Sequence, residues 1–167
     1  SFGLASFKDK TKATQVVGVD PELEAKLMDL ESHLFDGRVI TRDGHGIMLG
    51  HKLAEDLKAV IGDTLVIIGQ GYHGVSAAGK YEIVGSLKFP SPEINRRMIV
   101  MPLGLSQYLF SAENMLTGYT LIVDDTDRPD KATKGIISQV DTSKYEVMTW
   151  PELMPEMVQM RTTKVAG

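Results

Sequence analysis

The spacing of apolar and polar residues in the first part of the chain predicts a strand followed by a helix. Residues 16–19, Val-Val-Gly-Val, predict a short strand. Asp20 and Pro21 are residue types preferred at the cap and at the first position of a helix. Leucines then recur on one helical face, at positions 23, 27, 30 and 34. Because Gly37 is a residue type that ends helices, the pattern predicts a helix from Pro21 to about Gly37.

The middle of the chain predicts two strands joined by glycine-rich residues. A strand is predicted at 64–68, which contains the apolar run 65–68, and residues 81–89 alternate apolar and polar side chains with the period of a half-buried strand. Since glycines dominate the stretch between them, we expect the two strands to pair as a hairpin. Three further elements are predicted: a helix over residues 49–57, a strand over 98–101 and a helix over 103–110.

The last third of the chain changes to a regular alternation. Strands are predicted at 119–123 and 145–149, and helices at 129–140 and 151–161, which together make a β-α-β-α unit. The predicted fold class is therefore α+β, with mixed sheets, β-α-β units and an inserted β-rich subdomain that contains the hairpin.

The composition predicts a folded domain and makes one class of partner, nucleic acid, unexpected. The chain has 167 residues, of which 43% are hydrophobic and 24% charged, so enough apolar surface exists to offset chain entropy. Its net charge of −4 offers no basic surface for a phosphate backbone, and nucleic acid is not an expected partner. Zero cysteines exclude thiolate metal sites and thiol nucleophiles. The apolar runs fall far short of the roughly 20 residues that cross a bilayer.

Two glycine-rich motifs overlap between residues 69 and 80. Residues 69–74 match GxGxxG and residues 74–80 match GxxxxGK. The first motif needs a helix that opens at its third glycine, whereas a strand is predicted within a few residues. The second needs a Ser or Thr after its lysine, and Tyr81 follows Lys80. We therefore interpret this stretch as a hairpin turn without a phosphate site.

Other candidate functional residues lack the spacing or the sequence context that a functional site would require. His45 and His51, with Asp43 nearby, have no metal-binding spacing and are interpreted as solvated loop histidines. The aspartates at 124, 125, 127 and 130 lack the glycine and the closing glutamate of a calcium loop. The methionines at 148, 154, 157 and 160 are interpreted as core packing. No catalytic, cofactor-binding or metal-binding residue is predicted, and the chain is not expected to be an enzyme.

Several short motifs follow one another in order along nearly the whole chain. They are GVDP at 18–21, IMLG at 47–50, IGDTL at 61–65, YEIVG at 81–85, the segment 98–103 with Gln107, and YEVMTW at 145–150. In this order they resemble the MacB-like periplasmic core domain of ABC-transporter permeases, the family of macrolide exporters, lipoprotein-releasing permeases and FtsX-type permeases.

The resemblance implies an extracytoplasmic, or periplasmic, domain at the bacterial inner membrane, anchored by flanking transmembrane helices outside this chain. It implies a second permease copy, a cytoplasmic ABC ATPase subunit and a periplasmic carrier or adaptor as partners. Such a domain transmits conformational change and contacts cargo or a partner during export or lipoprotein release. We expect one domain over residues 1–167, with 1–37 and 115–167 as a porter-like β-α-β part and 38–114 as the inserted β-rich subdomain.

One loop is the candidate contact site. In lipoprotein-releasing members a protruding loop contacts a carrier protein, and its counterpart here is the short hairpin around residues 70–79. Tyr72 and His73 are the candidate contact residues, and an exposed turn without a partner is the alternative interpretation. Two other functions stay open: a regulatory permease domain that activates an extracellular partner without transport, and a nucleotide-binding enzyme that would rest on the glycine motifs alone.

Overall fold

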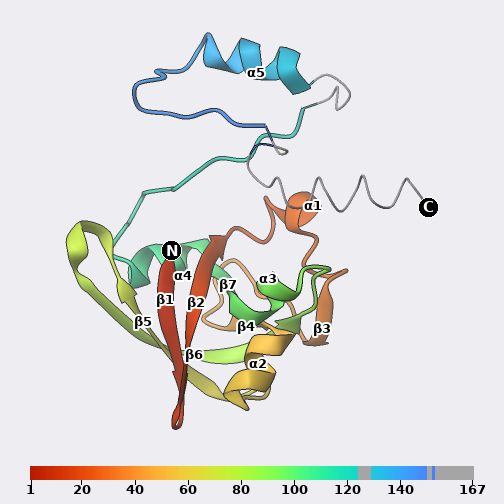
Figure 1. The fold of residues 1–167 in the computed structure, drawn as a ribbon, viewed down its shortest axis with the longest axis vertical. Helices are drawn as coiled ribbons and strands as arrows, with labels where there is room; N and C mark the ends of the chain where they lie inside the picture. The colour runs from red at the N-terminus through yellow and green to blue at the C-terminus, as the bar shows by residue number, and fades with distance from the viewer. Residues whose placement is uncertain (124–128, 150–151, 153–167) are drawn as a thin grey trace. The chain divides into compact units, whose positions relative to one another are not determined.

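The computed structural model describes residues 1–123, 129–149 and 152, and the chain divides into two units, Ser1–Thr117 and Gly118–Gly167. The first unit contains one seven-stranded sheet and short helices, shown in Figure 1. Its strands are β1 (Phe2–Phe7), β2 (Lys10–Val19), β3 (Leu34–Gly37), β4 (Ile47–Gly50), β5 (Thr64–Gln70), β6 (Ser76–Leu87) and β7 (Met98–Pro102). Its helices are α1 (Ala25–Met28), α2 (His51–Leu57), α3 (Pro92–Arg97), α4 (Leu103–Leu109) and the 3-10 turn η1 (Tyr72–Gly74).

The sheet is mixed and closes on itself. Its strand order is β3-β6-β4-β7-β2-β1-β5, and β5 also pairs with β6. The pairs β2–β7 and β4–β6 are parallel, while the other pairs are antiparallel. The first half of β6 pairs with β5 and its second half with β4, so this one long strand completes a ring. The predicted α+β class with a mixed sheet is confirmed.

The main hydrophobic core lies inside this strand ring. Alternate side chains of each strand point inward, because successive residues of a strand face opposite sides of the sheet. Helix α2 adds Leu53 and Leu57, and the end of α4 adds Leu109. The fully buried strand residues of this main core are Ala5, Ile47, Leu49, Leu65, Ile67, Ile99 and Met101. Burial of these apolar side chains is the main source of the stability of the first unit.

A second apolar cluster covers the outer face of β4, β6 and β7. It joins Met48, Val84 and Val100 to Leu30 and Ile40. The last two residues belong to the segment 20–42, which leaves β2 and crosses over these strands. Strands β4 and β7 are therefore buried on both faces, as their uninterrupted apolar runs require.

The long helix predicted after Pro21 is wrong. Helix α1 has only four residues and ends at Asp29, whose backbone is left-handed with φ 42°. Leu23, placed on the predicted apolar stripe, is 76% exposed. The residues expected to complete the helix form β3, which pairs with the end of β6. Pairing with a distant strand has overridden the local helical spacing of the leucines.

Most other predicted elements of the first unit are confirmed. The strands at 64–68, 81–89 and 98–101 correspond to β5, β6 and β7, and the helix at 103–110 corresponds to α4. The helix predicted over 49–57 begins two residues later, at His51, because residues 47–50 form β4. The strand predicted at 16–19 is the end of β2, while β1, β4 and α3 were not predicted.

The second unit departs from its prediction. Helix α5 (Pro129–Ile137) is confirmed within the range 129–140. The strands predicted at 119–123 and 145–149 are wrong, because neither segment pairs with another described strand and Tyr119 is largely exposed. Except for Glu152, the helix predicted at 151–161 lies outside the described residues. None of the described helices is long and apolar enough to span a membrane.

The predicted division into two parts is not tested by this arrangement. Strands β1, β2 and β3, from residues 1–37, belong to the same sheet as the strands of residues 38–114. The grouping of 1–37 with 115–167 stays a prediction.

Candidate partner-contact site

The hairpin of β5 and β6 contains the candidate contact residues. The two strands pair antiparallel from Thr64↔Glu82 to Gln70↔Ser76, and the five residues between them turn the chain. The N–H of Gly71 donates to the carbonyl of Val75 at 2.7 Å, and the N–H of Gly74 donates to the carbonyl of Gly71 at 3.1 Å. The predicted hairpin is confirmed.

The conformation of the hairpin can be compared with the helix that each of the two glycine-rich motifs requires. After Gly74 the chain enters β6 within two residues, so no helix begins at the third glycine of GxGxxG. Residues 76–80 of the GxxxxGK match lie within β6 as extended backbone. A phosphate-binding loop requires a run of backbone N–H groups at the start of a helix, and neither motif has that helix.

The tip of the hairpin is fixed to the end of α4. The N–H of Tyr72 donates to the carbonyl of Phe110 at 2.8 Å, and the side chain of Phe110 is buried in the main core. A Cβ at Gly71 would lie 2.7 Å from the same carbonyl oxygen, so only glycine allows this close approach of two backbones. The tip is therefore held against the folded body.

Tyr72 and His73 lie side by side on this tip. Their ring centroids are 4.0 Å apart, with the ring planes inclined by 57°. Tyr72 is 47% exposed, and Val75 next to it is also exposed. The backbone of His73 is left-handed with φ 56°, a conformation that histidine adopts more readily than most residues. The structure thus brings the two predicted contact residues together as a small exposed surface that offers an aromatic face and hydrogen-bonding groups.

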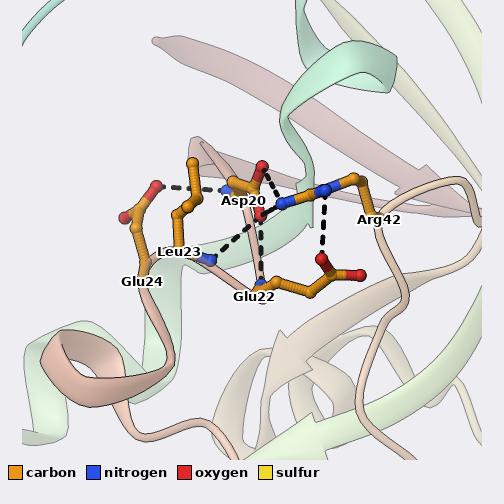
Figure 2. Close-up of polar contacts among 5 residues, drawn as sticks. All are labelled: Asp20, Glu22, Leu23, Glu24 and Arg42. Carbon is orange, nitrogen blue, oxygen red and sulfur yellow. Dashed lines mark hydrogen bonds and ion pairs between the residues drawn. The ribbon is translucent and has the colours of Figure 1, made fainter.

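A polar network joins the two ends of the segment 20–42, and Figure 2 shows its contacts among Asp20, Glu22, Leu23, Glu24 and Arg42. The carboxylate of Asp20 accepts from the N–H groups of Glu22 at 3.0 Å and Leu23 at 3.1 Å. The guanidinium of Arg42 lies 3.0 Å from the carboxylates of both Asp20 and Glu22. The predicted capping role of Asp20 is thus seen in the turn before α1, whose own cap position is Glu24.

The charge of Asp20 is stabilised by this network. Burial raises the pKa of Asp20, but hydrogen bonds from Arg42 and from the N–H groups of Leu23 and Glu22 lower it more, and the net pKa lies below the usual value of aspartate. A depressed carboxyl pKa stabilises the fold above the pKa of the unfolded chain and stops doing so as pH falls through the folded value. The network therefore contributes at neutral pH, and we assign it a structural role.

The two candidate metal-site histidines lie in different surroundings. His45 is exposed, as predicted. The prediction for His51 is wrong: it begins α2, is only 9% exposed, and its ring centroid lies 5.2 Å from that of Phe35. The contact with Phe35 places this position against β3. Among the described residues, no group of three or more His, Asp or Glu side chains is arranged to hold a metal ion.

Two other interpretations fall largely outside the described residues. The aspartates at 124, 125 and 127 are not described, so the calcium interpretation stays untested there. Of the four methionines expected in the core, only Met148 is described, and its side chain is substantially exposed.

The sequence did not predict a groove between β6 and α4. It has a volume of about 730 Å³. One wall is the start of β6, and the other is α4 with the residues that follow it. The groove-lining residues are His45, Ser76, Ala77, Ala78, Gly79, Lys80, Tyr81, Leu105, Tyr108, Leu109, Ser111, Glu113 and Met115. The one local signal is the run of small residues at 76–79, too small to cover the strand edge.

Comparisons with known proteins agree with this fold. The sequence model of the family described as MacB-like periplasmic core domain matches residues 1–139. The structure is similar to the extracellular domain of the ABC-type transporter YknZ from Gram-positive bacteria, with a TM-score of 0.61 and 15% sequence identity. That similarity covers 89% of this chain and 77% of the other. The sequence has no significant match among curated proteins.

Proposed function

The chain belongs to the family of MacB-like periplasmic core domains, and from this membership we propose that it is the extracytoplasmic domain of an ABC-transporter permease. The observation that carries the proposal is the family match over residues 1–139, and the fold likeness to a transporter's extracellular domain supports it. The domain binds and transmits force, while ATP is hydrolysed by a cytoplasmic ATPase subunit. Flanking transmembrane helices anchor it at the outer face of the inner membrane, next to a second permease copy.

The closed strand ring suits a force-transmitting role. Each strand of the ring pairs with a neighbour on either side, except that the first half of β6 pairs with β5 alone, and the core inside the ring consists of buried apolar side chains. Close-packed interiors deform little and move as rigid bodies. We infer that the first unit acts as a lever with two orientations, each stabilised by one state of the membrane helices. The lever requires the distance between the two copies to change during the nucleotide cycle.

The hairpin tip is the proposed contact with cargo or with a periplasmic carrier or adaptor. Tyr72 and His73 are exposed and adjacent, and the hydrogen bond from Tyr72 to Phe110 fixes the tip before any partner arrives. A preorganised loop loses less conformational entropy on binding than a mobile one. Aromatic side chains are also overrepresented among the residues that dominate binding energy.

Replacing both Tyr72 and His73 with alanine in the full-length permease is expected to weaken partner binding at least about tenfold, because truncation of a dominant contact costs about 2 kcal/mol or more. A photo-crosslinking residue at position 72 first identifies the partner in intact cells, and binding of that purified partner is then titrated against each variant. The control is the double variant Lys8→Ala and Asp9→Ala at the exposed β1–β2 turn, which should bind normally. Equal affinity for the tip variant and the parent would remove the tip from the proposal.

A further inference from the structure

One side of β6 lacks a strand partner along its first half. Residues 76–82 pair with β5 on one side. On the other side β4 pairs with β6 only from Ile83 onward. In the described part of the chain, no strand continues the line of β4 beside the first half of β6. The ring therefore closes through β6 but leaves one side of the first half of this strand unpaired.

The alternation of backbone hydrogen bonds between β5 and β6 identifies which N–H and C=O groups of β6 point to the unpaired side. The N–H of Ile83 donates to the carbonyl of Asp63 at 2.8 Å, and the carbonyl of Val75 accepts from the N–H of Gly71. Both residues are odd-numbered, so in the first half of β6 the odd-numbered residues direct their N–H and C=O groups toward β5. Antiparallel strands alternate residues that bond to the neighbour with residues that face away. Three residues therefore direct N–H and C=O away from β5: Ser76, Ala78 and Lys80. No described strand other than β5 pairs with these three residues.

The groove between β6 and α4 runs along this edge. Its β6 wall has small side chains at residues 76–79, which leave the backbone accessible to another backbone. Its opposite wall is largely apolar, with Leu105, Tyr108 and Met115. Lys80 and His45 also line it, against the single carboxylate of Glu113, and Lys80 forms no ion pair with a described residue.

We propose that this groove binds an extended peptide segment of a partner protein, which adds to β6 as a strand in line with β4. The unpaired N–H and C=O groups require a ligand with an alternating array of donors and acceptors, and an extended main chain is such a ligand. The apolar wall favours apolar side chains on the peptide, and Lys80 with His45 favours one acidic side chain. The site is separate from the hairpin tip and does not rest on the proposed transport role.

The test uses the complete 167-residue chain and a displayed library of random heptapeptides, together with a synthetic peptide of alternating valine and threonine that carries one aspartate. Amide hydrogen exchange is measured by NMR with and without each binding peptide. Bound peptide should slow exchange of the amides of Ser76, Ala78 and Lys80 at least about tenfold, because they gain hydrogen bonds. The amides of Ala77 and Gly79 already face β5 and should change little.

A matched pair of variants separates strand addition from ordinary surface binding. Ala78→Pro removes an N–H that faces the groove and leaves the bonds to β5 intact, so it should weaken peptide binding at least about tenfold. Ala78→Ser keeps the N–H and a small side chain and should bind as the parent does. If Ala78→Pro does not fold, the same peptide methylated on alternate backbone nitrogens replaces it and should not bind the parent chain.

Three results would overturn the inference: no library or synthetic peptide binds, bound peptides protect amides elsewhere, or removal of the N–H leaves the affinity unchanged. Protection pattern and variant effects are read on the isolated chain, so they do not depend on whether the parent protein is a permease.

Discussion

Replacing Ile67 with alanine is expected to lower the free energy of unfolding by about 3 kcal/mol, within the 2–5 kcal/mol typical of large-to-small core substitutions. Ile67 in β5 is fully buried inside the strand ring. Alanine would leave a cavity between strands that are fixed on both sides, so the neighbours cannot collapse into it. Urea unfolding at neutral pH, followed by circular dichroism, measures the loss.

The next residue provides the control. Ile68 is 45% exposed and faces the outside of the ring, because side chains alternate along a strand. Ile68→Ala should therefore cost less than about 1 kcal/mol. Equal losses for the two variants would mean that β5 has a different register and that the ring is wrongly assigned.

Replacing Asn95 with alanine is expected to cost about 2–3 kcal/mol. Asn95 in α3 is 4% exposed, and its side chain binds Phe89 twice. The amide oxygen accepts from the N–H of Phe89 at 2.8 Å, and the amide nitrogen donates to the carbonyl of Phe89 at 2.8 Å. The side chain thus replaces a strand partner just beyond the end of β6. Alanine leaves two backbone groups unpaired in partly buried surroundings, and each unpaired group costs about 1–3 kcal/mol.

Thermal and urea unfolding of Asn95→Ala would be compared with Glu93→Ala in the same helix. Glu93 is exposed and forms only a surface ion pair with Arg97 at 3.0 Å. Such pairs contribute little, so this control should lose less than about 1 kcal/mol. A loss for Asn95→Ala no greater than that of the control would show that the two bonds to Phe89 do not stabilise the turn.

Local sequence patterns predicted those helices and strands whose formation depends mainly on their own residues. The alternation in 81–89 identified β6, and the glycines before it, followed by Tyr81, indicated a turn and no phosphate loop. The leucine spacing after Pro21 misled because β3 is formed by pairing with β6, about fifty residues later in the chain. No local pattern reveals that partner. The closure of the ring is likewise a property of distant pairings.

The candidate site was partly predictable. Tyr72 and His73 were chosen because the resemblance makes their hairpin the counterpart of the protruding loop of lipoprotein-releasing permeases, and the glycine-rich residues around them predicted the turn itself. The contact between Asp20 and Arg42 joins residues on either side of α1 and β3, and the sequence alone does not pair them. The open edge of β6 depends on where β4 begins, which only the three-dimensional pairing shows.

The central claim is that this domain is the external part of a permease and moves with its nucleotide cycle. The chain contains no cysteine, so Asp9→Cys at the exposed β1–β2 turn gives this domain one spin-label site. The measurement is the distance between the labels of the two copies in the full-length permease with its ATPase, by pulsed electron paramagnetic resonance. We expect the distance distribution to shift when ATP binds and to return after hydrolysis and release. Identical distributions in every nucleotide state would contradict the claim.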